Sequence, residues 1–334
     1  MAHLLSIAEA TRLTRRALEA CGTSAANASS VAFALIGAEL AGQGGHGLRR
    51  LPAYAAQARS GKVDGKAVPH AARTRPGAIH VDAGYGFAYP ALDLAIQELL
   101  AIAPAQGIAV AGIVHSHHAG VAGLTVERLA ELGLVALMFT NSPAAMAPWG
   151  GSRALFGTNP IAFACPVEHK APVVVDVSLA KVARGKIMAA AQKGEAIPQG
   201  WALDRDGQPT ADAQAALAGT MLPLGDAKGT ALAMMVELLC AGLTGANYAS
   251  EQTSFFEADG APPGTGQAVL AIDPDAFGGV RALARFGELA AAVGGSEGAR
   301  IPGRRRQELR ARYEREGIPV DPALIDEIKR ISAA

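Results

Sequence analysis

An α/β fold is predicted by three features of this 334-residue sequence. Predicted strands and helices alternate along much of the chain, which is typical of α/β architecture. Hydrophobic residues make up 50% of the sequence, which is enough for a large core. The 39 glycines favour tight turns and loops whose backbone can line a binding site. The length suits two domains or one large α/β domain.

Three helices are predicted in the N-terminal part from their start and stop signals. Ser6 and Glu9 form a capping box. Pro52 fits the first turn of a later helix, and glycines follow the second and third helices. These signals predict helices over about residues 7–21, 24–41 and 53–59.

The rest of the chain is divided into elements by apolar runs and turn residues. Residues 201–210 have the composition of a hairpin-like loop. The segment 230–243 is the most apolar helix, and we expect it to be buried in the core. Strands are predicted at 78–82, 108–114, 134–139, 161–165, 173–176 and 266–272, and helices at 90–102, 125–132, 181–192 and over most of the C-terminal part.

Composition excludes several classes of protein. The 30 Lys and Arg residues balance the 30 Asp and Glu residues, which argues against a nucleic-acid-binding protein. The N-terminus lacks the features of a signal peptide, and the helix at 230–243 carries Glu237 and is shorter than the roughly 20 residues of a membrane span. Cys21, Cys165 and Cys240 form no disulfide framework, so we expect a cytoplasmic protein.

The segment Gly44-Gly45-His46-Gly47-Leu48-Arg49-Arg50 is the strongest candidate for a functional site. Histidine is well suited to exchange a proton near neutral pH, and arginine matches a carboxylate or sulfonate with its planar fork. The spacing indicates a proton donor beside an anion-binding residue. The alternative interpretation is a helix end with a loop histidine and two solvated arginines.

Other kinds of site are less well supported. His115, His117 and His118 are close in sequence, but their spacing matches none of the specific zinc motifs. Ser296 lies in a GxSxG segment, yet a helix rather than a strand is predicted before it. The dinucleotide motif GxGxxG is absent, so a dinucleotide would have to bind through a different backbone arrangement, with charge from Lys228, Arg184 and residues 304–306.

Ten ordered segments between residues 46 and 302 carry a resemblance to a known family. They include GHGLRRLPAYAAQARSGKVDG, HSHHAGVAG, NSPAAMAPWGG, VVVDVSLAKVARGKI, LPLGDAKG and PPGTGQAVLAIDP. The chain resembles the type 2 malate/L-lactate dehydrogenases. The resemblance implies a mixed, non-Rossmann sheet, a helical domain built from both chain ends, and a homodimer. It divides the chain into a helical part (1–75), an α/β part that binds cofactor and substrate (76–280), and C-terminal helices that pack back on the N-terminal part (281–334).

The resemblance also implies roles for individual residues. His46 would donate the proton to the substrate carbonyl or imine, Arg50 would bind the substrate carboxylate, and Thr158 would line the substrate pocket. No metal would be required. The residues expected to contact NADP or NAD are His118, Ala119, Gly120, Val121, Ala122, Asp176, Val177, Ser178, Arg184, Gly185, Lys228, Gly229, Arg304, Arg305 and Arg306.

Two departures from the family pattern affect the expected substrate. Gly45 stands where the family commonly has serine, so a serine-assisted proton relay is not available. Lys186 stands where cyclic-imine reductases carry aspartate, which favours a more anionic substrate. Several segments are similar to the (R)-3-sulfolactate dehydrogenase branch, whose substrate has a carboxylate and a sulfonate that Arg49, Arg50 and Lys186 would receive.

We therefore expect an enzyme that transfers hydride between NAD(P)H and a small 2-oxo or 2-hydroxy acid. The arginines at 304–306 favour NADP over NAD. The alternatives are a malate- or lactate-type dehydrogenase, a reductase of piperideine- or pyrroline-2-carboxylate, a metal-dependent hydrolase built on the histidine loop, and a non-catalytic dinucleotide-binding protein.

Overall fold

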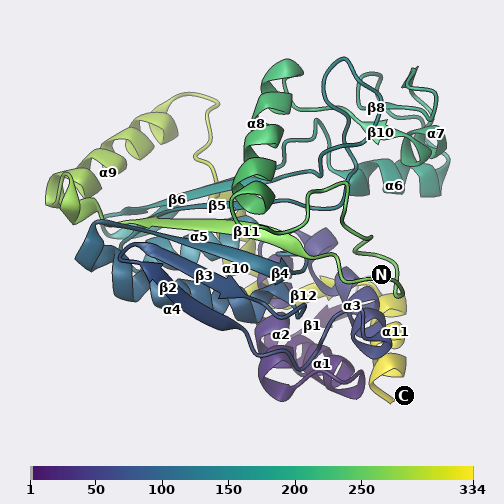
Figure 1. The fold of residues 1–334 in the computed structure, drawn as a ribbon, viewed down its shortest axis with the longest axis horizontal. Coiled ribbons are helices and arrows are strands. Elements are labelled where there is room, and N and C mark those ends of the chain that lie inside the picture. Colours follow the sequence, from purple (N-terminus) through teal and green to yellow (C-terminus); the bar gives the residue numbers. More distant parts are fainter. Residues whose placement is uncertain (1–2, 334) are drawn as a thin grey trace.

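A seven-stranded mixed sheet lies at the centre of the computed structural model, which describes residues 3–333 (Figure 1). Its strand order is β2-β3-β4-β11-β5-β6-β7. Among the paired neighbours in this order, β3 and β4 are parallel and the other pairs are antiparallel. This confirms the expected mixed, non-Rossmann sheet. The strands are β2 (His70–Arg75), β3 (Ala78–Asp82), β4 (Ile108–Ser116), β5 (Val135–Thr140), β6 (Ile161–Val167), β7 (Lys170–Val177) and β11 (Thr265–Ile272).

Two helices cover one face of the sheet. Helix α4 (Ala88–Gln106) packs against β3, β4 and β11, while α5 (Ala122–Glu131) packs against β5, β6 and β7. Fully buried Leu99, Val126 and Met138 belong to the core between these layers. Helix α5 begins three residues before the expected position. This brings its N-terminus to the loop that follows β4.

The opposite face carries α8 (Ala227–Glu237), a π-helical turn (Leu238–Gly242) and a small lobe (Figure 1). The lobe contains α6 (Arg184–Lys193), β8 (Ala202–Leu203), β9 (Pro209–Thr210), α7 (Ala213–Ala218) and β10 (Thr220–Met221). The pairing of β8 with β9 confirms the hairpin expected at 201–210. Helix α6 begins at Arg184 rather than near residue 181, because Ala180 forms a β-bridge with Pro223 and holds the preceding segment extended.

The prediction that the helix at 230–243 is buried in the core holds for only one side of it. Val236 and Cys240 pack inward, but Met234, Leu238 and Leu243 are each at least half exposed. Because this segment is apolar on all sides, its periodicity did not show which side faces the sheet. None of the helices described for residues 3–333 has the length and apolarity needed to cross a membrane.

Both ends of the chain contribute to one helical domain, as the resemblance implied (Figure 1). Strand β1 (His3–Leu5) pairs with β12 (Ile318–Val320), and α1 (Ile7–Ala20) packs against α11 (Pro322–Ala333). The expected capping box is present, with the Glu9 amide donating to Ser6 Oγ at 3.2 Å. The domain also contains α2 (Ala25–Leu40) and α3 (Leu51–Ser60), and the remaining helices of the C-terminal part are a short 3₁₀ turn (Pro274–Ala276), α9 (Val280–Gly295) and α10 (Arg304–Glu316).

One edge of the central sheet gathers the loops expected to bind ligands. Neighbouring strands from β4 to β7 are antiparallel, so the ends of β4, β5 and β7 meet the starts of β11 and β6. The loops 117–121, 141–160 and 178–183 therefore leave or enter the sheet at the same edge. This arrangement brings together segments that are far apart in sequence.

Candidate active site

His46 lies in two consecutive 3₁₀ turns, Gly44–His46 and Leu48–Arg50, between α2 and α3. The Leu48 amide donates to the Glu39 carboxylate at 2.7 Å and fixes the second turn. A Cβ added at Gly47 would overlap that carboxylate, so the close approach requires glycine here. The glycine cluster thus lets the loop fold tightly around Glu39 and holds His46 in a half-buried position.

A chain of hydrogen bonds starts at His46 and runs into the protein. His46 Nδ1 lies 3.1 Å from His118 Nε2, and His118 Nδ1 lies 2.5 Å from Tyr54 Oη. Tyr54 Oη is in turn 3.0 Å from Tyr89 Oη. The two imidazole rings are stacked, with their planes 14° apart. We call this set the His46–Tyr89 chain. It leaves His46 Nε2 as the ring nitrogen available to a ligand.

The buried environment keeps both histidines neutral. Burial, reinforced by the nearby Arg50 charge, lowers the pKa of His46 to about 4. Burial and the Arg50 charge, with smaller contributions from His46 and His117, hold the pKa of His118 well below its usual value. Burial raises the pKa of Tyr54 to about 12 and also raises the pKa of Tyr89. Both tyrosines therefore keep their protons at neutral pH.

Arg50 has the contacts expected of an anion-binding residue. Its Nε donates to the Gly45 carbonyl at 2.9 Å, and its guanidinium lies 4.3 Å from the centroid of the Phe256 ring. Its Nη1 is buried and has no hydrogen-bond partner within residues 3–333. A buried charged donor without a partner is costly, so this nitrogen fits the oxygen of an anionic ligand beside His46.

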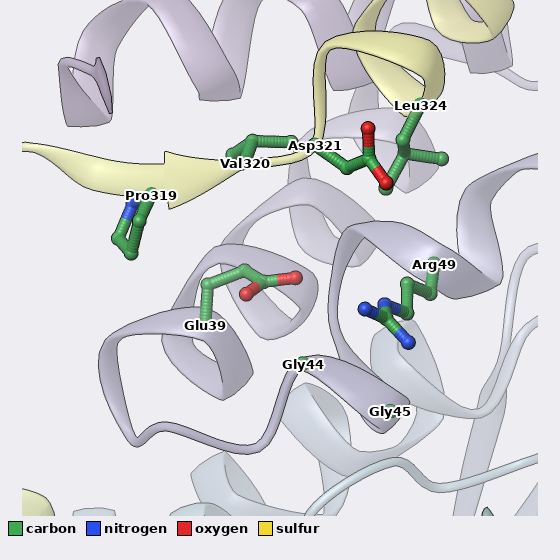
Figure 2. A pocket seen from close by; sticks show the side chains of 8 residues that line it. All are labelled: Glu39, Gly44, Gly45, Arg49, Pro319, Val320, Asp321 and Leu324. Atoms are coloured by element: carbon green, nitrogen blue, oxygen red, sulfur yellow. The ribbon is translucent and has the colours of Figure 1, made fainter. Parts of the chain in front are cut away.

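Arg49 lines a different cavity of about 270 Å³ (Figure 2). Figure 2 shows that its guanidinium lines this pocket together with the carboxylates of Glu39 and Asp321. Neither His46 nor Arg50 lines this cavity. The structure therefore separates the two arginines that the sequence placed side by side. Among residues 3–333, the Arg50 side chain donates a hydrogen bond to the His46 loop and the Arg49 side chain does not.

The three histidines expected in one loop have different surroundings, because β4 continues to Ser116 and His115 belongs to the strand. His115 pairs with Asp82 at 3.0 Å. His117 is enclosed by the rings of Tyr54, Phe87 and Phe255, whereas His118 belongs to the chain described above. Across residues 3–333, no three or more His, Cys, Asp or Glu side chains form a group that could hold a metal ion.

A second cluster lies at the N-terminus of α5. Asp176 accepts a 2.9 Å hydrogen bond from the Gly123 amide, and a Cβ at Gly123 would lie 2.6 Å from Arg306 Nη1. Arg306 is buried near Glu127, and its Nε has no partner among the described residues. The Asp176 carboxylate already accepts from this helix start, so the buried Arg306 nitrogen is the group here that suits an anion such as a phosphate. The structure thus brings Asp176, Arg306 and the loop ending at Ala122 together.

The loop before β6 is fixed near the same edge of the sheet. Thr158 accepts the Leu179 amide at 2.8 Å and the Ser178 hydroxyl at 3.4 Å through its carbonyl oxygen. The buried Glu237 carboxylate receives the Asn159 side-chain amide at 2.8 Å and the Asn141 side-chain amide at 3.0 Å. Glu237, noted in the sequence only as a charge in an apolar helix, therefore anchors the loop that carries Thr158.

The other expected cofactor residues have local interactions. Arg184 donates to the Leu217 carbonyl at 3.4 Å, and Arg304 forms an exposed ion pair with Glu308. Within residues 3–333, none of the remaining candidates shares a hydrogen bond or ion pair with His46 or Arg50. These candidates lie on the first turn of α6 (Gly185 and Lys186), the first turn of α8 (Lys228 and Gly229) and the exposed side of α10 (Arg305).

Sequence reasoning missed Tyr54 and Tyr89. Both lie on apolar helices and have the appearance of core residues, since nothing in their spacing distinguishes a buried hydroxyl that joins a hydrogen-bonded chain. Gly120 is an indirect sign that the Tyr89 hydroxyl lies close to the loop after β4. Its φ of +67° favours glycine, and a Cβ there would come within 2.7 Å of Tyr89 Oη.

Comparison with known proteins identifies relatives over nearly the whole chain. A sequence profile described as malate/L-lactate dehydrogenase matches residues 5–329. A (2R)-3-sulfolactate dehydrogenase (NADP(+)) from Chromohalobacter salexigens is 49% identical over 331 residues, covering 98% of both chains. Among solved structures, a Δ1-piperideine-2-carboxylate reductase from Pseudomonas syringae has a TM-score of 0.93 at 40% identity, with 98% of this chain and 99% of that chain covered.

A sulfolactate dehydrogenase from Methanocaldococcus jannaschii has a TM-score of 0.91 at 28% identity, covering 99% of this chain and 97% of its own. The matches extend through the His46 loop, the sheet and the C-terminal helices. The chain belongs to the malate/L-lactate dehydrogenase family and is an NAD(P)-dependent oxidoreductase.

Proposed function

We propose that the enzyme reduces 3-sulfopyruvate to (R)-3-sulfolactate, or catalyses the reverse reaction, with NADP as its preferred cofactor. The observation that carries this proposal is the unpartnered, buried Nη1 of Arg50 beside His46. It provides an anion-binding group next to a proton donor. The 49% identity to an NADP-dependent sulfolactate dehydrogenase supports this substrate and this cofactor.

In the proposed reaction, Arg50 binds the substrate carboxylate and so orients the neighbouring carbonyl. His46 gives a proton from Nε2 to the carbonyl oxygen, because its Nδ1 is already bonded to His118. The chemistry that NADPH supplies when bound is hydride donation to the carbonyl carbon. Phe255 and Phe256 flank His118 and Arg50, respectively, and limit the access of water to the site.

Cofactor binding is proposed at the sheet edge that gathers the loops. Arg306 suits the phosphates through its unpartnered Nε, and residues 118–122 and 176–178 lie beside it at the start of α5. Arg304 and Arg305 are the candidates for the 2′-phosphate that distinguishes NADP from NAD. We further propose that residues 184–185 and 228–229 complete the cofactor site, that Thr158 lines the substrate pocket, and that Arg49 and Lys186 are candidates for the sulfonate.

The substrate proposal is tested by a panel of 2-oxo acids with NADPH or NADH, followed at the nicotinamide absorbance. We expect 3-sulfopyruvate to give the highest kcat/KM, and NADPH to be preferred to NADH. Highest activity with oxaloacetate or pyruvate would replace the proposed substrate and leave the roles of His46 and Arg50 in place. Highest activity with pyrroline-2-carboxylate would instead show that the enzyme is a cyclic-imine reductase, the activity that names the Pseudomonas syringae relative at 40% identity.

We also propose that the enzyme is a homodimer in which a second copy covers the exposed side of α8. That side presents Leu232, Met234 and Met235, followed by Leu238 and Leu243, all more than a third exposed. A contiguous apolar surface of this kind is typical of an interface. Leu238→Glu should therefore convert the dimer to a monomer in light scattering. Leu132→Glu, at another exposed leucine, is the control, and a Leu238→Glu protein that stays dimeric would exclude this face.

A further inference from the structure

A second pocket of about 520 Å³ lies behind the active-site loop, between α1, α2, α4, α5 and α10. We call it the rear pocket. Its wall includes Phe33, Leu92 and Leu124, and also Tyr89, Ala119 and Val121. His46, His118 and Arg50 do not line it. Tyr89 is therefore the member of the His46–Tyr89 chain that reaches this pocket.

The His46–Tyr89 chain connects the active site, at His46, with the rear pocket, at Tyr89, through hydrogen bonds. Its three links measure 3.1, 2.5 and 3.0 Å, so each neighbouring pair is within hydrogen-bonding distance. The two inner members are buried, with exposed fractions of 8% at His118 and 0% at Tyr54. Of the two ends, His46 is half-buried, and Tyr89, although only 6% exposed, lines the rear pocket.

The donors and acceptors along the chain can all point one way. His118 Nε2–H donates to His46 Nδ1, Tyr54 O–H donates to His118 Nδ1, and Tyr89 O–H donates to Tyr54 Oη. Water in the rear pocket then donates to Tyr89. Each group in this arrangement is neutral and gives one hydrogen bond while accepting one.

We propose, building on the function above, that Tyr54 and Tyr89 relay protons between the rear pocket and His46 during turnover. As His46 releases its Nε2 proton to the substrate oxygen, its Nδ1 takes the proton of His118 Nε2. His118 Nδ1 takes the Tyr54 proton, Tyr54 takes the Tyr89 proton, and Tyr89 takes one from a water in the rear pocket, which leaves hydroxide that exchanges with solvent. One proton enters and one leaves, so no residue ends with a net charge, and the imidazole tautomers and hydroxyl orientations return to their starting arrangement before the next reduction. In the oxidation of the hydroxy acid, the same bonds reverse.

The electrostatic surroundings support a relay of neutral groups. Arg50 is the charge whose influence reaches His46, His118, Tyr54 and Tyr89, and it opposes a cationic intermediate at either histidine. With a pKa near 4, His46 is almost entirely neutral at pH 7, so a donor that had first to become an imidazolium would be scarce. At the active-site end, the charges that act on the chain belong to Arg50 and His117. At the Tyr89 end, the charged residues that line the rear pocket are Arg15, Asp93, Glu127, Arg128, Glu131, Arg310 and Glu314.

This relay also accounts for two features of the loops. Gly45 supplies no side chain to assist His46, and the His46 Nδ1 that would need such assistance is bonded to His118 instead. Gly120 packs against Tyr89, since a Cβ added at Gly120 would lie 2.7 Å from the Tyr89 hydroxyl. The predicted cofactor loop thus holds the last hydroxyl of the chain in place.

The test is Tyr89→Phe, which removes one hydroxyl and keeps the ring. We expect kcat for reduction in the wild type to change by less than about twofold between pH 6 and 8, because the relay supplies the proton. In Tyr89→Phe, His46 must be protonated directly as an imidazolium. Its kcat should then fall about tenfold per pH unit over this range, as expected above a pKa near 4. The proton inventory in H₂O–D₂O mixtures should change from curved to linear, while KM stays within about twofold of the wild-type value.

Tyr85→Phe is the matched control, since Tyr85 is exposed and its hydroxyl has no hydrogen bond among the described residues. Tyr54→Phe should reproduce the Tyr89→Phe profile, and thermal unfolding checks that each variant is folded. If the pH profiles and inventories of both variants match those of the wild type, the relay is overturned. A wild-type enzyme that reduces none of the 2-oxo acids would instead overturn the proposed function, and the two failures are therefore distinguishable.

Discussion

His46→Ala should lower kcat for 2-oxo acid reduction by a factor of about 10²–10⁴, the usual contribution of general acid catalysis. The imidazole is the group that delivers a proton to the developing alkoxide, and its Nδ1 is already committed to His118. The expected cofactor contacts lie around α5 and the sheet edge rather than in the His46 loop. The Kd for NADPH, measured by fluorescence titration, should therefore stay within about twofold of the wild-type value.

A matched control for His46→Ala is His80→Ala, because His80 is an exposed histidine on β3, away from the His46 loop. The control should keep wild-type kcat and KM. If His46→Ala kept more than about a tenth of wild-type kcat, another group would have to donate the proton. A loss of NADPH binding equal to the loss of kcat would show that His46 mainly supports the cofactor site.

Local signals in the sequence were sufficient for much of the fold and for the centre of the site. The Ser6 capping box set the start of α1, and Gly61 ended α3 in a left-handed conformation. The glycine cluster also indicated correctly that His46 lies just beyond a helix in a tight turn. These features depend on residues within a few positions of one another, where sequence spacing determines geometry.

Features that depend on tertiary packing were not predictable in the same way. Arg49 and Arg50 are adjacent in sequence, but successive residues of a helical turn point in different directions, so they line different surroundings. Tyr54 on α3 and Tyr89 on α4 meet only through the tertiary fold, which brings their hydroxyls within 3.0 Å of each other and Tyr54 against His118 in the loop after β4. The exposed side of α8 could not be predicted either, because apolar residues occur on all sides of this helix and their periodicity does not identify the side that faces the sheet.

Substituting Arg50 should mainly affect substrate binding. Arg50→Lys keeps the charge and loses the fork, so KM for the 2-oxo acid should rise about tenfold, equivalent to about 1.5 kcal/mol for one charge-assisted hydrogen bond. Arg50→Met removes the charge as well and should lower kcat/KM at least about 30-fold, or ~2 kcal/mol. Steady-state kinetics at saturating NADPH measures both effects.

Arg50→Met should also change the pH behaviour of His46. The Arg50 charge is the second cause, after burial, that lowers the pKa of this histidine. Removing the positive charge makes the imidazolium easier to form, so the pKa of His46 should move up from about 4 towards its usual value. NMR titration of the His46 ring would measure this shift without requiring turnover.

The parallel variant Arg49→Met separates the two neighbouring arginines. Arg49 faces Glu39 and Asp321 across its own cavity (Figure 2), whereas Arg50 carries the unpartnered nitrogen beside the His46 loop. If Arg50 binds the carboxylate, only Arg50→Met should raise KM for pyruvate, which has a carboxylate and no second anionic group. If Arg49 receives the sulfonate, Arg49→Met should raise KM for 3-sulfopyruvate alone. A rise in KM for pyruvate in Arg49→Met but not in Arg50→Met would reverse the assignment, because the carboxylate would then bind on the Glu39 side of the loop.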